Sequence, residues 1–566
     1  MKMFLQTVFG GFLVLAFLQL TNCTPLTNSV GSEHNDATVG FENSGDVRPN
    51  IIIILVDDMG YSDFSSYGGE IPTPNIDRLA ENGLRFTQFY NNARCSPTRA
   101  ALLTGLNPHQ AGMGYLANRM NLPESRGTHG VLHPRSITIA EILQDEGYFT
   151  ALSGKWHLSY AAGSVPEDRG FERSLSAHDG AIYFPEQRAH PSVEENNRGY
   201  LLLDGDRIST ADEMFGENWY GTELWTEWGI DFIAEAGSPD QPFFLYLSHV
   251  TPHFPVMARS EDIDLFRGRY LQGWDKLRED RFARQKEMNL IDPDTALPTR
   301  LPDVPSWSEL TTPEKERFDA IMSVYAGAIH SLDQSVGRLV DYLEDSGQLE
   351  NTLILILSDN GGNAESGPDG RAIGNDLGGP NSDVFVGMNW ATLQNTPFSF
   401  FKHFTAEGGI ATPMIAHWPN GIAPERRGHF ERSPSHVIDI MPTILDVSGA
   451  DYPETRNGTE ILPFEGISLT PAFRGGVLDR SEPLFWEHEG NRAIRDGRWK
   501  AVMRLAGDWE LYDMGSDPTE LNDLADSDPE KVRSMAKAWD RWAERTYVDE
   551  WPETEARTNW GGRKRK

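Results

Sequence analysis

The chain has 566 residues and carries 84 acidic against 50 basic side chains, a formal net charge of −34. So acidic a chain is not a general nucleic-acid binder, because such binding depends on neutralising phosphates with Lys and Arg. The hydrophobic fraction of 39% is ordinary for a globular protein and allows a large buried core. Any anionic ligand must therefore be held by a local basic pocket.

Residues 1–23 are predicted to be a signal peptide. Lys2 precedes an apolar run, which is the shape of a secretory signal. Residues 20–23 (LTNC) are similar to a bacterial lipoprotein box, although the asparagine departs from the small residue usual before the cysteine. Plain secretion and attachment through a lipidated Cys23 both stay open, and either predicts export to the periplasm, cell surface or medium. Polar residues 24–48 are predicted to be a flexible linker.

Four short runs are predicted to be buried parallel strands. Residues 51–56 are continuously apolar, as in a strand that is covered on both faces, and residues 150–153 are a shorter candidate. The four runs are Ile51–Val56, Thr150–Ser153, Phe243–Ser248 and Leu353–Leu357. Helical periods lie between them, for example over residues 329–343, where apolar side chains share one helix face and stop near Gly347. Strands that alternate with helices predict an α/β fold with a mostly parallel sheet flanked by helices.

Each of these runs leads into residues that are charged or can bind a metal. One carboxylate after a strand is often only a helix cap, but four such endings are better explained by one site at the carboxyl edge of the sheet. The oxygen donors suit Ca²⁺ or Mg²⁺ rather than zinc; they are Asp57, Asp58, Asp359 and Asn360. The groups with positive charge or proton-transfer capacity are Arg99, Lys155, His157, His253 and Lys402. A metal ringed by basic groups predicts a site for a phosphate or sulfate ester.

Cys95 stands at the start of a predicted helix, because Pro97 fits a first helical turn. A helix N-terminus offers free N–H groups to an anion. If Cys23 is lipidated or removed, Cys95 has no disulfide partner. Its neighbours Arg94, Ser96 and Arg99 are polar, which favours a residue presented at the anion site over a cysteine buried as a small hydrophobe.

Residues 95–99 (CSPTR), continued by LTG, resemble the signature of the type I sulfatases in the alkaline phosphatase superfamily. Further blocks look like those of the family and run in its order: DDMG at 57–60, TPNID at 73–77, GKWHL at 154–158, TPHFP at 251–255, SDNG at 358–361 and EGG at 407–409. The resemblance covers residues 49 to about 550, and the segment around 265–324 looks most like bacterial arylsulfatases.

The resemblance implies a large mixed, mostly parallel sheet of alkaline phosphatase type in a catalytic domain over residues 49–448. It also implies a smaller C-terminal subdomain, residues 449–553, with an antiparallel sheet and a helix. The sequence pattern there is short and strand-like, followed by a helical period; the stretches are Leu484–Glu487, Arg495–Val502, Trp509–Tyr512 and the helical Val532–Ala543. Residues 554–566 are predicted to be a solvated basic tail.

In the family that this chain resembles, a separate formylglycine-generating enzyme recognises the C-x-P-x-R segment and oxidises its cysteine to Cα-formylglycine (3-oxoalanine). The resemblance therefore implies that Cys95 is modified. A hydrated aldehyde carries two hydroxyls on one carbon: one attacks sulfur, and the other lets the aldehyde re-form as sulfate leaves. A thiol or simple alcohol would lack that exit route.

Further roles follow from the resemblance. One Ca²⁺ would be held with modified Cys95 by Asp57, Asp58, Asp359 and Asn360. Arg99 would steady the nucleophilic oxygen, Lys155 would neutralise sulfate oxygens, and His157 would handle the proton of the formylglycine hydroxyl. His253 and Lys402 would face the leaving oxygen, one of them donating a proton. His249, four residues before His253, is expected to be structural.

Three functions fit these residues. The resemblance favours a sulfatase that hydrolyses sulfate monoesters, arylsulfatase-like and exo-acting on sulfated carbohydrates such as marine polysaccharide fragments. A phosphomonoester or phosphonate monoester hydrolase of the same superfamily is the first alternative. A non-catalytic protein that binds sulfated glycans is the second. The stretches Asp179–Arg198 and Asn375–Asn395 are expected to be loops at the entrance.

Overall fold

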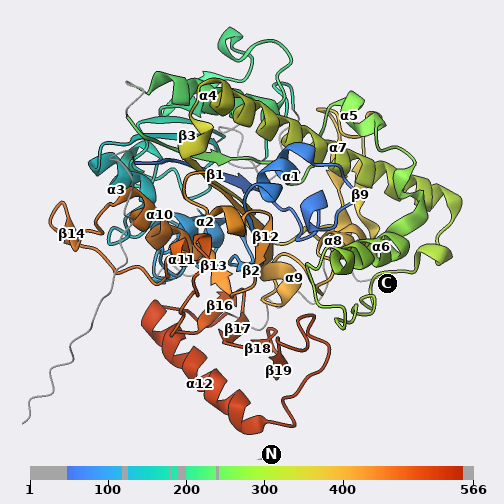
Figure 1. Ribbon diagram of the computed structural model, residues 1–566. Helices are drawn as coiled ribbons and strands as arrows, with labels where there is room; N and C mark the ends of the chain where they lie inside the picture. The colour runs from blue at the N-terminus through green and yellow to red at the C-terminus, as the bar shows by residue number, and fades with distance from the viewer. Residues whose placement is uncertain (1–47, 118–124, 178–180, 188–198, 237–240, 552–566) are drawn as a thin grey trace, which may run out of the picture. The chain divides into compact units, whose positions relative to one another are not determined.

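The computed structural model describes residues 48–117, 125–177, 181–187, 199–236 and 241–551 (Figure 1). The predicted signal peptide with Cys23, almost all of the linker, the basic tail and most of Asp179–Arg198 lie outside the described residues. Within the described part of the chain, no helix is long and apolar enough to cross a bilayer.

Among the described residues, eleven strands form one mixed sheet in the order β12-β2-β11-β8-β1-β7-β3-β4-β5-β6, with β13 beside β2. The strands are β1 (Asn50–Val56), β2 (Leu84–Tyr90), β3 (Phe149–Lys155), β4 (Arg173–Ala177), β5 (Tyr200–Leu203), β6 (Asp206–Ser209), β7 (Phe243–Ser248), β8 (Thr352–Ser358), β11 (Ala411–His417), β12 (His429–Glu431) and β13 (Ser435–His436). Strands β8, β1, β7, β3 and β4 pair in parallel, and β11 is antiparallel to both β8 and β2. The predicted mostly parallel α/β sheet is confirmed.

The four predicted strands are present and run through the centre of this sheet. Ile51 of β1 lies opposite Leu353 of β8 on one side and Phe244 of β7 on the other. Residues 51–56 are all fully buried, so side chains on both faces of β1 are covered, which explains the continuous apolar run. Strand β3 is longer than predicted and includes Lys155, because it pairs with β4 as far as that residue.

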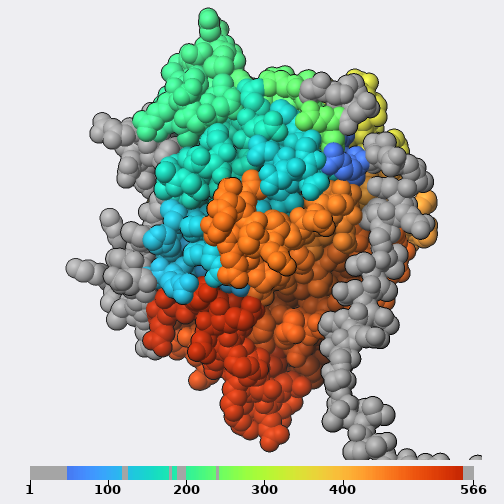
Figure 2. Space-filling model, turned by 90° about the vertical axis from the view of Figure 1, so that its left-hand side faces the viewer, coloured from blue at the N-terminus to red at the C-terminus, as the bar shows by residue number. Residues whose placement is uncertain are grey.

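Two groups of helices pack around the sheet. Helix α4 contacts β3 and β7 and is itself covered by α7, the long helix that carries the predicted apolar face and ends near Gly347. Helices α2, α3 and α10 contact one another in a second group. Figure 2 shows the surface over this group, where the cyan segment with α3 adjoins the orange segment with α10. The helices are α1 (Pro74–Glu81), α2 (Cys95–Thr104), α3 (Ile139–Asp145), α4 (Gly221–Glu235), α5 (Ser260–Asp264), α6 (Gly273–Glu287), α7 (Thr312–Asp345), α8 (Gly387–Gln394), α9 (Glu407–Ile410), α10 (Ile440–Ser448) and α11 (Thr470–Phe473).

A separate antiparallel sheet near the C-terminus packs against α12 (Pro529–Thr546), drawn in red in Figure 1. Its strands are β16 (Leu484–His488), β17 (Asn491–Asp496), β18 (Trp499–Met503) and β19 (Trp509–Asp513). The predicted small antiparallel sheet is confirmed, and the strand-like stretch Arg495–Val502 spans parts of two of its strands, β17 and β18. That stretch crosses a hairpin turn at Gly497, whose positive φ of 55° suits glycine.

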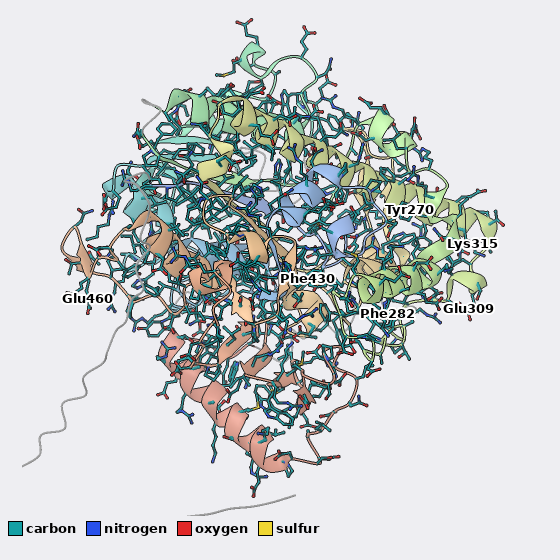
Figure 3. All side chains as sticks on the ribbon, viewed as in Figure 1. Tyr270, Phe282, Glu309, Lys315, Phe430 and Glu460 are labelled. Atoms are coloured by element: carbon teal, nitrogen blue, oxygen red, sulfur yellow. The ribbon has the colours of Figure 1, made fainter. Side chains whose placement is uncertain are left out.

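The stretch Asn375–Asn395, expected to be a loop, also holds regular structure: β10 (Asp383–Phe385) and α8 lie within it. Strand β10 pairs with β9 (Arg371–Ile373), and a further small hairpin joins β14 (Thr455–Arg456) to β15 (Thr459–Glu460). In Figure 3 the labelled Glu460 marks this second hairpin.

His249 follows β7 directly and is fully buried. Burial, with a smaller effect of Arg338, lowers its pKa to about 3, so the native state holds a neutral imidazole. In the unfolded chain this imidazole has a pKa of about 6.5 and takes up a proton that the folded protein excludes. The free energy of unfolding is therefore highest above pH 6.5 and decreases as the pH falls toward 3. The structure is consistent with a packing residue, as expected from the sequence.

We therefore expect the wild type to lose about 2–3 kcal/mol more stability than His249→Gln between pH 7 and pH 4.5. Urea unfolding at the two pH values measures this difference. His429→Gln, at an exposed position, is the matched control and should follow the wild type. Equal losses in wild type and His249→Gln would contradict the assignment.

Candidate active site

The site lies where the carboxyl ends of the central strands meet the start of α2. Asp57 follows β1 and Asp359 follows β8, and the parallel pairing of Val56 with Ser358 brings these two carboxylates together. Cys95 is the first residue of α2. Ligand atoms of Asp57, Cys95 and Asp359 lie within 4.8 Å of one another. The sheet register therefore unites residues that stand about 300 positions apart.

Arg99 lies one turn along α2 from Cys95 and is fully buried. Its Nε and Nη2 donate to Asp359 Oδ2 at 3.1 and 2.8 Å. Its Nη1 donates to the carbonyl oxygen of Lys155 at 2.8 Å and to the hydroxyl of Ser248. One guanidinium thus joins α2 to the ends of β3, β7 and β8.

Two buried lysines pair with the two carboxylates that follow β1. Lys155 Nζ lies 2.6 Å from Asp57 Oδ2, and Lys402 Nζ lies 2.5 Å from Asp58 Oδ1. Lys402 is only 1% exposed, so it is not a solvated loop lysine. Burial alone would raise the pKa of Asp58, but Lys402, His253 and Lys155 hold it well below its usual range. Asp58 is therefore ionised.

His253 and His157 complete the ring of basic groups. His253 Nδ1 lies 2.6 Å from the carbonyl oxygen of Phe254, so Nδ1 carries the proton and the basic Nε2 lies 3.6 Å from Asp58 Oδ2. Burial, with Lys155 and Lys402 nearby, lowers the pKa of His253 to about 3. The pKa of His157 also lies well below its usual range, from burial and from Lys155. Both imidazoles are neutral.

The donor set fits a hard cation. Asp57 Oδ1 and Asn360 Oδ1 are buried, and neither has a hydrogen-bond partner among the residues that the structure describes. Asn360 Nδ2 donates to Asp58 Oδ1 at 2.7 Å, which turns its oxygen away from Asp58. Burial and the nearby Asp57 raise the pKa of Asp359 despite Arg99, and a cation would relieve that crowding. Clustered carboxylate and amide oxygens are the ligands that Ca²⁺ and Mg²⁺ take.

The structure differs from the sequence analysis at Cys95 and adds residues to the site. Cys95 is buried, 2% exposed, and packs on Tyr115 and Leu116. The prediction that Cys95 is not buried is wrong. Its polar neighbours do not make the segment accessible, because they are paired within the fold: Arg94 Nη1, for example, donates to Glu365 at 2.9 Å. Asn363 Nδ2 donates to Asp58 Oδ2 at 2.5 Å. Its place three residues after Asn360 was the only signal for it.

Aromatic side chains lie beside His253. The ring of Phe254 stacks on His253 with centroids 4.2 Å apart, and Phe385 of β10 lies 4.5 Å from Phe254. Part of the stretch Asn375–Asn395 therefore reaches the neighbourhood of His253, and its place at the entrance stays a prediction.

The C-terminal sheet reaches the site through a buried ion cluster. Lys500 of β18, fully buried, lies 2.6 Å from Glu407 and 2.8 Å from Glu520. Glu407 begins α9, and the carbonyl oxygen of Gly409 accepts from the backbone N–H of Gly361, next to Asn360. The fit is close, because a Cβ on Gly361 would lie 2.0 Å from the Gly408 carbonyl oxygen. The cluster thus supports the segment that carries Lys402.

These features define a class. An enzyme that hydrolyses anionic esters can use three features: oxygen donors for a hard cation, basic groups around the anion and a helix N-terminus that faces it. All three occur here at the carboxyl edge of a mixed α/β sheet.

The comparisons narrow this class. The family model described as Sulfatase matches residues 49–450, and the model described as N-sulphoglucosamine sulphohydrolase, C-terminal, matches residues 398–544. The chain belongs to the sulfatase family, the type I sulfatases of the alkaline phosphatase superfamily, and is a sulfuric ester hydrolase.

Individual relatives agree. An arylsulfatase of Klebsiella aerogenes is 35% identical over 435 residues, covering 75% of this chain and 91% of the relative. An uncharacterised sulfatase of Schizosaccharomyces pombe is 34% identical, covering 87% of this chain and 93% of the relative. Among solved structures, Ps i-CgsB in complex with k-i-k-neocarrahexaose is 26% identical with a TM-score of 0.66, covering 90% of this chain and 96% of that one. A phosphonate monoester hydrolase of Agrobacterium radiobacter, at 20% identity and a TM-score of 0.54, shares the fold.

We expect Lys500→Met to destabilise the protein by about 3–5 kcal/mol, because it leaves Glu407 and Glu520 buried without their cation. Urea unfolding measures the loss. Lys537→Met, at an exposed position on α12, is the control and should change stability by less than about 0.5 kcal/mol. A Lys500→Met variant as stable as the control would show that the cluster does not support this segment.

Proposed function

We propose that the protein hydrolyses sulfate monoesters of carbohydrates through a Cα-formylglycine made from Cys95, with one Ca²⁺ bound beside it. One observation supports this proposal above all: Cys95 Sγ lies within 4.8 Å of a carboxylate oxygen of Asp57 and of a carboxylate oxygen of Asp359. Cys95 also begins C-x-P-x-R, the segment that a formylglycine-generating enzyme would read during maturation. The Cys95 side chain packs on Tyr115 and Leu116 and also lies beside two carboxylates, a position that packing alone does not require.

The Ca²⁺ ligands would be Asp57, Asp58, Asp359, Asn360 and residue 95. When bound, the cation would polarise the sulfate and favour the ionised form of the nucleophile, while the aldehyde hydrate would supply the attacking oxygen. Arg99 would hold Asp359 and steady the oxygen of residue 95.

The remaining groups would act on the sulfate and the two transferred protons. Lys155 would face sulfate oxygens while its other contact, Asp57, fixes its position. His157 is neutral and can accept the proton of the attacking hydroxyl. His253 and Lys402 would face the leaving oxygen, one of them donating its proton. Their contacts with Asp58 place both on the same side of the site.

The choice of carbohydrate substrates rests on relatives. The structure of Ps i-CgsB holds k-i-k-neocarrahexaose, and a relative from Bacteroides thetaiotaomicron, 26% identical, is an N-acetylglucosamine-6-O-sulfatase. We infer an exported exo-sulfatase for sulfated saccharides, with marine polysaccharide fragments as one source. The predicted signal sequence supports export, and Cys23 offers a route to lipid attachment.

The test of this function is a mass spectrum of the peptide containing residue 95, together with rates on the sulfate and phosphate esters of 4-nitrophenol. We expect formylglycine in place of cysteine, sulfatase activity in excess of phosphatase activity, and no measurable sulfatase activity in Cys95→Ala. An intact thiol in active enzyme would overturn the proposed nucleophile. A faster phosphate or phosphonate ester would favour the alternative hydrolase.

Metal binding has a separate test. Asp359→Asn removes a ligand charge while keeping the side-chain shape, so we expect Ca²⁺ affinity to fall at least about tenfold. Equilibrium dialysis followed by elemental analysis measures bound Ca²⁺ directly. Asp341→Asn, whose side chain is 69% exposed on α7, is the matched control and should bind one Ca²⁺ as the wild type does. Equal affinity in both variants would remove Asp359 from the ligand set.

A further inference from the structure

A cavity with mostly apolar walls and a few polar side chains lies on α6 and α8, apart from the candidate active site. Its volume is about 370 Å³, and none of its lining residues belongs to that site. In Figure 3 the labelled Phe282 lies on α6, the helix that forms one wall. The exposed Thr299 and Arg300 stand at its mouth, and the buried Trp274, Arg278 and Asn389 lie deeper. This size is within the range of small-molecule sites.

Arg278 brings a buried positive charge into this cavity and forms no ion pair with Asp275 or Glu279, the two acidic residues that also line it. The residue is 7% exposed, and no acidic group of the described residues lies within ion-pair distance of it. Asp275, the acid that acts electrostatically on Arg278, is occupied: it accepts from Arg300 at 2.9 Å and from the backbone N–H of Trp307 at 2.9 Å. Burial lowers the pKa of Arg278 to about 10, against a weaker pull from Asp275. The guanidinium is still charged at neutral pH.

Two polar atoms of these side chains are left without hydrogen bonds. Arg278 Nη1 donates to the carbonyl oxygen of Pro298 at 2.6 Å, but its Nε is buried and has no partner in the described parts of the chain. Asn389 Nδ2 donates to the carbonyl oxygen of Pro368 at 2.7 Å, and its Oδ1 is likewise buried and unpaired. A buried unpaired polar atom costs about 1–3 kcal/mol. Both atoms have almost no accessible surface, so a ligand reaches them only after a small shift of these side chains, and it would then recover that cost.

We propose that this cavity is an accessory binding site for a small anionic sugar, such as a uronate or a sugar sulfate. The anionic group pairs with Arg278, and a sugar hydroxyl donates to Asn389 Oδ1. The apolar walls from Trp274, Leu297 and Val304 suit the C–H face of a pyranose ring. The anion site follows from the position and contacts of Arg278, whereas the choice of a sugar as the ligand rests on the proposed function.

Hydrogen bonds join the segment that lines this cavity to segments beside the catalytic centre. Leu393 lines the cavity, and its carbonyl oxygen accepts from Arg281 Nη1 at 3.3 Å. Arg281 also donates to Asp63 Oδ1 at 2.8 Å, five residues after Asp58. Two residues beyond Leu393, Asn395 Oδ1 accepts from the backbone N–H of Gly362, beside the predicted metal ligand Asn360. The cavity therefore borders a segment that also contacts the residues next to the predicted metal ligands.

Isothermal titration of the purified full chain with glucuronate tests the proposal, with galactose as the neutral comparison. We expect saturable glucuronate binding that weakens at least tenfold in Arg278→Met and in Thr299→Trp, which narrows the mouth without touching a buried group. Lys276→Met, with an exposed side chain on α6, should bind as the wild type does. Galactose should bind at least tenfold more weakly than glucuronate.

The active-site variant Lys155→Met separates this site from the catalytic one. Glucuronate binding that persists in Lys155→Met and is lost in Thr299→Trp supports the accessory site, whether or not the enzyme proves to be a sulfatase. The absence of saturable binding to the wild type overturns the proposal. Glucuronate binding that is lost only in Lys155→Met also overturns it, and so does binding that survives both cavity variants. Equal affinity for galactose and glucuronate would show that Arg278 does not bind the anionic group.

Discussion

The structure depends on balancing three carboxylates that are buried at one edge of the sheet. Asp57, Asp58 and Asp359 are each at most 1% exposed. Charges so far from water are tolerated only when they are paired. The partners are equally buried: Lys155 for Asp57, Lys402 for Asp58 and Arg99 for Asp359. Each pair joins different segments, so the electrostatic requirement also fixes β1, β3, β8, α2 and the loop before α9 relative to one another.

Register is what makes this balance possible. Strands β8, β1, β7 and β3 are parallel neighbours, so the residues that follow them emerge at one edge. Arg99 meets that edge because α2 begins there, one turn earlier, at Cys95. The C-terminal sheet then backs the arrangement through Lys500, which supports the Glu407 segment. A shift of any of these strands by one residue would turn its terminal ligand away from the site.

The central strands could be predicted from sequence because burial on both faces leaves a continuous apolar run. Asp57, Asp58, Asp359 and Asn360 could be predicted as a group because they follow those runs directly, whereas Cys95, Arg99 and Lys402 follow none of them. Other elements carry no such signal. Strand β11 contains Pro413, and the structure accommodates it at an irregularity in the pairing with β2 between Thr412 and Met414. The hairpin in Arg495–Val502 depends on one glycine with positive φ, and Asn363 joins the site only through the path of its loop.

Charge balance also bears on which anion the site would accept. The three carboxylates are matched by Arg99, Lys155 and Lys402, so the protein's own charges cancel before any ligand enters. A divalent cation among the oxygen donors would add two positive charges. A singly charged sulfate monoester and an ionised oxygen on residue 95 would cancel them, whereas a phosphate monoester dianion would leave one negative charge in excess. In a buried site such an excess is costly, so the arrangement of ion pairs favours sulfate monoesters over phosphate monoesters. It also explains how a chain with a net charge of −34 can bind an anion: the attraction is local, and the acidic surface takes no part in it.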